Sequence, residues 1–204
     1  MIILASNSPR RKELLSMLGY DFTVRPADCD ERSQLTEPGE LVCALSRRKA
    51  LAVNREDGDL VIGSDTVVAL NGAILGKPAD VRSAGEMLRS LSGKTHTVYT
   101  GLCVVYGEQT VCECVSCEVH FKELTEQEID AYLATGEPMD KAGAYGIQGK
   151  GAAFIEWIKG DYYAVMGLPC CRLNQVLHSF GFFSDKINRL LTQICFPFQK
   201  GSCL

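Results

Sequence analysis

The sequence predicts a mixed α/β fold. Short apolar runs, typical of buried strands, alternate along the chain with segments that carry a helical apolar face. The 204 residues are 46% hydrophobic and 23% charged, which is ordinary for a globular protein and excludes a disordered or collagen-like chain. A chain of this length buries about 70% of its unfolded surface, so it needs neither a disulfide nor a metal ion to fold. One domain is expected, with two small ones as the alternative.

Residues 2–19 have the pattern of a strand, a tight loop and a helix. Residues 2–5 form an apolar run, Ser8 is a favourable N-cap, and Pro9 suits the first position of a helix. Gly19 is a good helix stop. A short strand-like stretch and a second helix are expected next, over 22–24 and about 38–53.

The middle of the chain reads as a hairpin followed by a helix. A strand over 60–62 ends at a glycine, and residues 67–70 continue extended up to Asn71-Gly72, which is a strong hairpin-turn signal. Asp80 can cap a third helix, which Gly93 ends. Two strands are expected after it, over about 97–106 and 110–121.

A capping box of Thr125 and Glu128 predicts a fourth helix. The glycine-rich segment that follows it must be a loop or backbone in close approach to another group. The remaining expected elements are a loop over 141–151, extended stretches over 152–158 and 162–166, a helix over 169–180 and a short helix over 185–194.

The charge and the cysteines exclude several classes of partner. The formal net charge is −4, without the basic balance typical of a nucleic-acid binder. No apolar run is long enough to span a membrane and the N-terminus does not resemble a signal peptide, so we expect a cytoplasmic protein. The ten cysteines are then expected to be reduced, mostly as small buried residues. Cys112, Cys114 and Cys117 do not match paired zinc spacing, but a metal or redox role stays open.

Three cations occupy the predicted first turn of the first helix: Arg10, Arg11 and Lys12. This is the unfavourable end of a helix dipole for positive charge. Free backbone amides and cations at a helix N-terminus form a site for an anion, most obviously phosphate. The alternative is a solvated basic helix surface.

Carboxylates provide a second set of candidates. Asp65 follows an apolar strand within Gly-Ser-Asp-Thr, where it could act as a general base or metal ligand, or simply as a turn residue. Asp30 and Glu31 form an acidic pair farther upstream. If this pair meets Asp65 in space, a hard divalent cation could bridge the carboxylates and a phosphate; otherwise the pair is solvated.

Two lysines and one glutamine complete the candidates. Lys77, in Gly-Lys-Pro, is either a phosphate-neutralising residue or part of a surface turn. Lys49 flanks the apolar stripe of the second helix, where a surface lysine with a buried stem is the favoured interpretation. The glycine-rich loop fits neither the Walker nor the dinucleotide pattern. Its Gln148 carries an amide donor and acceptor that could read the edge of a base.

Five blocks of sequence together resemble the Maf-like nucleotide pyrophosphatase family. They are Ala-Ser-Asn-Ser-Pro-Arg-Arg at 5–11, Gly-Ser-Asp-Thr-Val-Val at 63–68, Gly-Lys-Pro at 76–78, Leu-Ser-Gly-Lys-Thr-His at 91–96 and Asp-Lys-Ala-Gly-Ala-Tyr-Gly-Ile-Gln-Gly at 140–149. The resemblance covers about residues 1–180. It implies an elongated mixed sheet flanked by helices, with two lobes around a cleft, as in the inosine triphosphatase fold. It also implies hydrolysis of nucleoside triphosphates to the monophosphate and pyrophosphate.

The resemblance assigns roles to the candidate residues. Asp65 matches the proton acceptor, and the branch that this sequence resembles prefers dTTP and UTP. A divalent cation, Mg²⁺ or Mn²⁺, is expected at Glu31 and Asp65. The specificity positions are Arg10, Thr66 and Gln148, and the phosphate-binding positions are Ser6, Arg11, Lys49 and Lys77.

Three further expectations follow. We expect a single domain over 1–204, with its motifs within about 1–182 and a tail over 183–204. We expect a nucleoside triphosphate partner and a homodimer, with neither nucleic acid nor membrane. The alternatives are a 7-methyl-GTP or inosine triphosphate pyrophosphatase, and a non-catalytic nucleotide-binding regulator of cell division, because the family is linked to septum formation.

Overall fold

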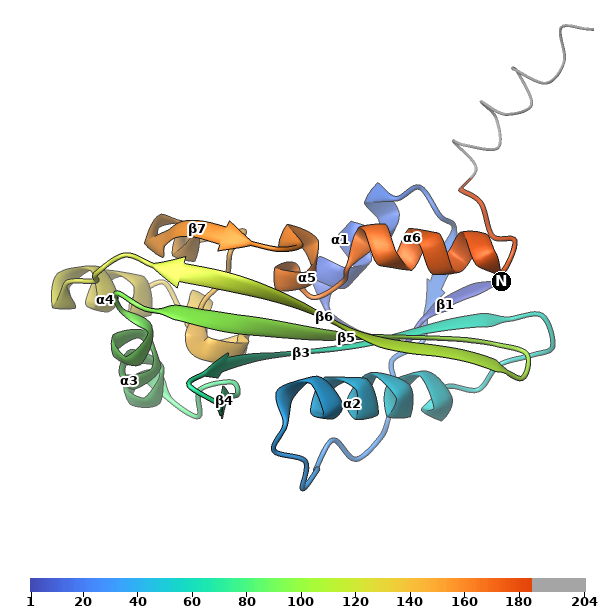
Figure 1. Cartoon of the computed structure of the whole chain (residues 1–204), viewed down its shortest axis with the longest axis horizontal. Coiled ribbons are helices and arrows are strands. Elements are labelled where there is room, and N and C mark those ends of the chain that lie inside the picture. Colours follow the sequence, from blue (N-terminus) through green and yellow to red (C-terminus); the bar gives the residue numbers. More distant parts are fainter. Residues whose placement is uncertain (185–204) are drawn as a thin grey trace, which may run out of the picture.

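The computed structural model describes residues 1–184, which form a seven-stranded mixed sheet with helices on both of its faces (Figure 1). The strand order is β2-β1-β3-β5-β6-β7, and β4 pairs with β3. The α/β fold class is therefore confirmed. The strands are β1 (Ile2–Leu4), β2 (Phe22–Val24), β3 (Leu60–Leu70), β4 (Ala73–Leu75), β5 (Thr95–Tyr106), β6 (Gln109–Phe121) and β7 (Ile155–Lys159). The helices are α1 (Pro9–Met17), α2 (Pro38–Ala52), α3 (Val81–Leu91), α4 (Glu126–Leu133), α5 (Tyr162–Met166) and α6 (Cys170–Ser179), with short 3-10 helices η1 (Glu137–Asp140), η2 (Ala142–Ala144) and η3 (Lys150–Phe154).

Three long antiparallel strands, β3, β5 and β6, run along the length of the molecule (Figure 1). On the other side of β3, β1 pairs only with residues 60–62 and β4 only with residues 68–70. Within residues 1–184, the β3 edge at 63–67 therefore pairs with no strand. This open edge lies between the two ends of the molecule.

Separate cores lie at the two ends of the sheet. One core packs α1 and α6 against the beginning of β3 and includes Leu15, Ile62 and Leu173. The other packs α3, α4 and the 3-10 segments against the far end and includes Leu88 and Phe121. The open edge of β3 therefore lies between two lobes.

Glycines let α2 pack directly on the sheet. A Cβ atom on Gly63 would lie 2.2 Å from the carbonyl oxygen of Ser46 in α2. A Cβ atom on Gly101 would lie 2.1 Å from the carbonyl oxygen of Val42. Gly101 is also the register partner of Asp65. The backbone of α2 is therefore in contact with the sheet beside Asp65.

Replacing Gly101 with Ala tests this close approach. The added methyl group has no space beneath α2, and overpacking of this kind costs about 1–3 kcal/mol. We expect a lower urea midpoint with an unchanged m-value. Gly76→Ala is the matched control, because a Cβ at Gly76 meets nothing within 4 Å. Equal midpoints for the two variants would contradict the close approach.

The structure corrects three expectations. Residues 162–166, expected to be extended, form α5, which Asp161 caps and Gly167 ends with a φ of 111°. Within the expected stretch 152–158, the first residues belong to η3 and only those from Ile155 on are strand. Asp65 lies inside β3 and not after its end. The short helix expected over 185–194 lies outside the described residues.

The sequence signals at helix ends predict the structure more accurately than the strand patterns do. The capping box expected for α4 forms, with reciprocal bonds between Thr125 and Glu128. Asp80 caps α3 as expected, and Ser83 completes a second capping box there. Ser8 caps α1, and Pro9 opens it. No helix within residues 1–184 combines the length and apolar character needed to cross a membrane.

Candidate active site

A cleft of about 960 Å³ opens over the unpaired edge of β3. Its walls come from both lobes: the segment before and within α1, the turn after β4, the loop from η1 to Gly149, and the end of α5. Every residue to which the family resemblance assigns a role lines it, whereas two further candidates, Lys12 and Asp30, do not. The residues with assigned roles are Ser6, Arg10, Arg11, Glu31, Lys49, Asp65, Thr66, Lys77 and Gln148.

The open edge explains how neighbouring residues of one strand share the cleft. Side chains alternate between the two faces of a strand, so Asp65 and Thr66 point to opposite faces of β3. Asp65 faces α2, whereas Thr66 faces Arg11 and Thr100. Because no strand covers this edge, both side chains reach the cleft.

Lys49 links two carboxylates beside the open edge. Its Nζ atom lies 2.6 Å from Oδ1 of Asp65 and 3.0 Å from Oε2 of Glu31. The side chains of Lys49 and Asp65 are each only 11% exposed. The interpretation of Lys49 as a surface lysine is therefore wrong, because the close packing of α2 brings it over Asp65. Asp30 does not join this group; Arg32 binds its carboxylate and lowers its pKa.

Arg11 is held by the protein itself. Its Nε donates to the carbonyl of Gly167 at 2.8 Å, and its two terminal nitrogens donate to Ser6 and Thr66, both at 3.2 Å. Burial lowers the pKa of Arg11, and the nearby charge of Asp65 opposes that shift. Three of its five N–H groups are therefore engaged, which leaves two for a ligand.

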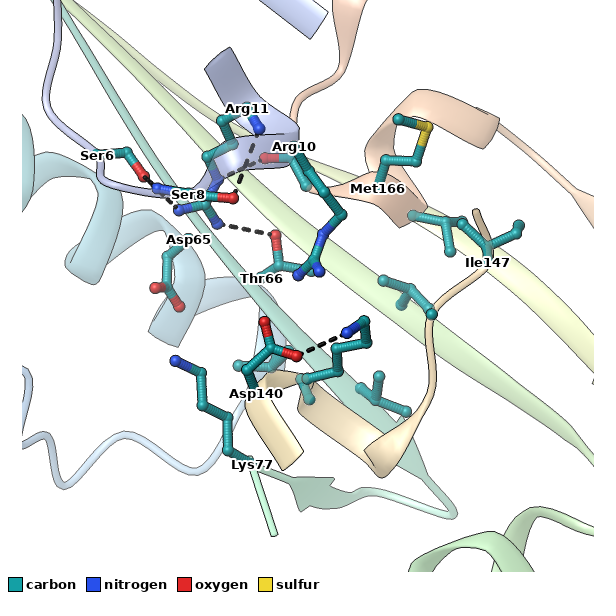
Figure 2. Close-up of a pocket in the computed structure, with 18 of the residues that line it drawn as sticks. Ser6, Ser8, Arg10, Arg11, Asp65, Thr66, Lys77, Asp140, Ile147 and Met166 are labelled. Atoms are coloured by element: carbon teal, nitrogen blue, oxygen red, sulfur yellow. Dashed lines mark hydrogen bonds and ion pairs between the residues drawn. The ribbon is translucent and has the colours of Figure 1, made fainter. Parts of the chain in front are cut away.

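Arg10 and Lys77 approach the cleft from opposite walls. In Figure 2, the Arg10 side chain extends from the start of α1 into the space beside Thr66 and Asp140. The Lys77 side chain extends from the turn after β4 toward Asp65. Neither side chain makes a hydrogen bond or ion pair with another residue in the described range 1–184, so both cations are available to an anion.

The loop that carries Gln148 is fastened by Glu137, a residue that is not among the candidates expected from the sequence. The Glu137 carboxylate accepts hydrogen bonds from the Tyr132 hydroxyl at 2.8 Å and from the Lys150 and Gly151 amides at 3.0 and 3.4 Å. The Tyr132 hydroxyl also accepts from the amide of Gly146. No sequence motif indicates this clamp, because Glu137 and Tyr132 lie outside the block at 140–149.

Glycines bring this loop against the clamp. A Cβ atom on Gly149 would lie 2.2 Å from Oε1 of Glu137, and one on Gly146 would lie 2.7 Å from the Lys141 side chain. Lys141 in turn donates to the Glu137 carbonyl and to the Asp140 carboxylate. Gln148 is exposed at the rim of the cleft and makes no hydrogen bond within residues 1–184. Its amide is therefore free to meet a ligand.

The carboxylates are suited to share a hard cation with a ligand. Asp65 and Glu31 reach the same ammonium group, so two carboxylates face one point at the edge of the cleft. No group of three His, Cys, Asp or Glu side chains in the described part of the chain could hold a metal. Mg²⁺ commonly uses one or two carboxylates and takes its other ligands from phosphate and water. The residues therefore fit a cation that arrives with a phosphate.

Comparison with known proteins identifies the family. The Maf-like protein family matches residues 1–180. This chain belongs to the Maf-like family. A relative from Thermococcus onnurineus, named dTTP/UTP pyrophosphatase, is 52% identical over 169 residues, which are 83% of this chain and 92% of the relative. Proteins of the same name from Bacillus cereus and Bacillus anthracis are each 50% identical over 181 residues, covering 88% of this chain and 95% of theirs.

Proposed function

We propose that this protein hydrolyses dTTP and UTP to the nucleoside monophosphate and pyrophosphate. The names of its relatives support the substrates. The observation that carries the reaction is the buried pair of Lys49 and Asp65 at a cleft edged with unpaired cations. A triphosphate is a small polyanion with several charges, and such a cleft suits it despite the net negative charge of the chain.

Four cations and one hydroxyl can hold the triphosphate. Arg10 and Lys77 are free to bind phosphate oxygens from opposite walls. Arg11 offers its two remaining N–H groups, and Ser6 lies beside it at the backbone turn before α1. Lys49 is the cation nearest to Asp65, so it lies where charge develops during the reaction.

Asp65 is the group that we assign as general base. Its carboxylate accepts a proton from water, whose oxygen bonds to the α-phosphorus while the bond to the oxygen bridging the α- and β-phosphorus atoms breaks. Pyrophosphate then leaves, with Lys49, Arg11 and Lys77 compensating its charge. Bound Mg²⁺ or Mn²⁺, held by Asp65 and Glu31, would supply further neutralisation of phosphate charge.

We assign Gln148 to recognition of the nucleobase. Its amide can donate to O4 of uracil or thymine and accept from N3–H of the same ring. Thr66 and Arg10, which also line the cleft, complete the expected specificity positions. Thr66 is held in place by Thr100, whose hydroxyl lies 3.0 Å away and donates to the Ala164 carbonyl.

A panel of nucleoside triphosphates tests this function. We expect pyrophosphate release from dTTP and UTP in the presence of Mg²⁺ or Mn²⁺, and none after chelation. Release of orthophosphate, or no release from any pyrimidine nucleotide, would contradict the proposal. Preferential release from 7-methyl-GTP or inosine triphosphate would replace the substrate, and binding without hydrolysis would favour a non-catalytic regulator. A homodimer stays a prediction, which sedimentation of the full chain tests.

Replacing Glu137 with Gln should loosen the loop that carries Gln148. A glutamine amide can keep one acceptor for Tyr132, but its NH₂ group then faces the Lys150 amide, which is also a donor. One lost hydrogen bond is worth about 1 kcal/mol, so we expect KM for UTP to rise roughly 5-fold with little change in kcat. Glu126→Gln on α4 is the control, measured by steady-state kinetics. A fall in kcat for E137Q as large as the expected rise in KM would instead place Glu137 in the chemistry.

A further inference from the structure

Four cysteines gather between α2 and the sheet face beneath it. We call this group, Cys43 of α2, Cys103 of β5, and Cys112 and Cys114 of β6, the thiol seam. The Cys112 Sγ atom donates to the carbonyl of Cys43 at 3.3 Å and lies 3.7 Å from the Ser46 hydroxyl. Cys114 Sγ lies beneath Gly39, near the start of α2. All eight cysteines within residues 1–184 are free thiols.

The expectation of buried thiols holds for only part of this seam. Cys103 is fully buried, Cys112 and Cys43 are half-buried, and Cys114 is exposed. The seam therefore runs from the core to the surface, and Cys112 lies at the point where an inaccessible thiol meets an accessible one. Cys112 is therefore partly exposed to solvent, whereas Cys103 is not exposed at all.

Strand register places Cys103 and Cys112 directly opposite each other. They are Cα partners in the antiparallel pair of β5 and β6. Directly opposed residues project to the same face of a sheet, with Cα atoms about 4.5–5.5 Å apart. Disulfides span Cα separations of about 4.4–6.8 Å, so these two sulfurs can bond without a change in strand pairing.

The environment favours Cys112 as the reactive member of the pair. A hydrogen bond from Cys103 lowers the pKa of Cys112, with help from Ser46, Cys43 and the nearby charge of Arg47, although burial opposes the shift. The same interaction raises the pKa of Cys103. Thiolates are the nucleophilic form of cysteine, so oxidation begins at the accessible sulfur.

We propose that Cys112 and Cys103 form a peroxide-sensitive disulfide site, with Cys112 attacking first and Cys103 resolving. The Cys112 sulfur attacks one oxygen of hydrogen peroxide; the O–O bond breaks, and hydroxide leaves as water with the thiol proton. The sulfur of Cys103 then attacks the resulting sulfenic acid, the S–O bond breaks, and a second water leaves. Two thiols and one peroxide thus yield one disulfide and two waters.

Oxidation at this site bears on the active site through α2. It removes the proton that Cys112 donates to the Cys43 carbonyl, which is one of the contacts that hold α2 to the sheet. Lys49 is in the same helix, less than two turns beyond Cys43, and holds Asp65. This consequence rests on the proposed function, and we expect pyrophosphate release to fall several-fold after oxidation and to recover with dithiothreitol.

Peptide mapping of the peroxide-treated full chain tests the disulfide independently of activity. Cleavage after glutamate separates Cys103 from Cys112 at Glu108 and isolates Cys43 and Cys114 on other peptides. We expect a link between the 87–108 and 109–113 peptides in the unmodified sequence and in the control variant C171S, which removes an exposed thiol on α6. The link should be absent in C112S, and C103S should stop at a sulfenic acid that dimedone traps.

Two mapping results would overturn the site. One is a link from Cys112 to Cys43 in place of Cys103. The other is that both sulfurs stay reduced at peroxide doses that oxidise Cys171. The activity measurement separates the two proposals. A mapped disulfide in a protein that hydrolyses no pyrimidine nucleotide would support the disulfide site and overturn the proposed pyrophosphatase function. Undiminished hydrolysis by the fully linked protein would overturn the effect through α2.

Discussion

Replacing Asp65 with Asn should lower kcat for UTP and dTTP by about 10³-fold, within the 10²–10⁴-fold range of a general base. Asparagine has the same shape and can still accept a hydrogen bond from Lys49, but it cannot take a proton from water at neutral pH. Lys49 keeps Glu31 as an ionic partner at 3.0 Å, so we expect the fold to persist. Pyrophosphate release under saturating nucleotide measures the effect.

The control for this variant is Asp130→Asn. Asp130 is an exposed carboxylate on α4, outside the cleft, and the exchange makes the same change of charge. We expect kcat for D130N to match the unmodified protein, and circular dichroism to be the same for both variants. Near-normal turnover by D65N would remove Asp65 from the role of base. If D65N does not fold, Asp65→Glu takes its place in the comparison. D65E should keep part of the rate of the unmodified protein only if the reaction needs a carboxylate at this position.

The Lys49 side chain is more buried in the structure than the sequence predicts. Its place beside the apolar stripe of α2 suggests a solvated amino group. Its burial depends on Gly63 and Gly101, which lie on two strands outside α2 and which let this helix pack closely on the sheet. No pattern within α2 predicts this close packing, because the space for it comes from glycines in other elements.

Asp65 differs from its expected place for a related reason. Gly63 weakens a strand pattern, so the pattern predicts that the strand ends before Asp65. In the structure, β3 continues to Leu70, and the glycine is required by α2. What sets Asp65 apart is that residues 63–67 pair with β5 alone and have no strand on their other edge within the described residues, which depends on where β1 and β4 stop. The ends of these strand pairings are set by tertiary structure, so no local sequence pattern predicts them.

Features that depend on neighbouring residues are predicted well. The caps at Ser8, Asp80 and Thr125 form because each cap and its partner lie within three residues of each other. The prediction for the short apolar run at 162–166 fails because a run of this length suits a strand or a buried helix equally, and the decision falls to tertiary packing. The site residues are identified through family motifs; their identity is visible in the sequence, but the clamp at Glu137 is not.

Replacing Gln148 with Glu should change which base the cleft accepts. The carboxylate can accept from N3–H of uracil or thymine, but it places negative charge against O4, which is also an acceptor. A good bidentate contact to a base is worth about 1–3 kcal/mol, so we expect kcat/KM for UTP and dTTP to fall roughly 10- to 100-fold. Both substrates should lose equally, because the edge that Gln148 would read is the same in uracil and thymine.

The opposite change is expected for a base edge rich in donors. A methylguanine ring offers N–H groups to a carboxylate, so the preference for 7-methyl-GTP relative to UTP should rise in Q148E. Gln127→Glu, an exposed exchange on α4, is the matched control and should leave the substrate order unchanged. Because Gln148 makes no hydrogen bond within residues 1–184, its replacement has no native partner to disrupt, and an altered preference reports on the ligand alone. An unchanged ratio of kcat/KM values would mean that the base is read elsewhere in the cleft, with Arg10 and Thr66 as the positions to vary next.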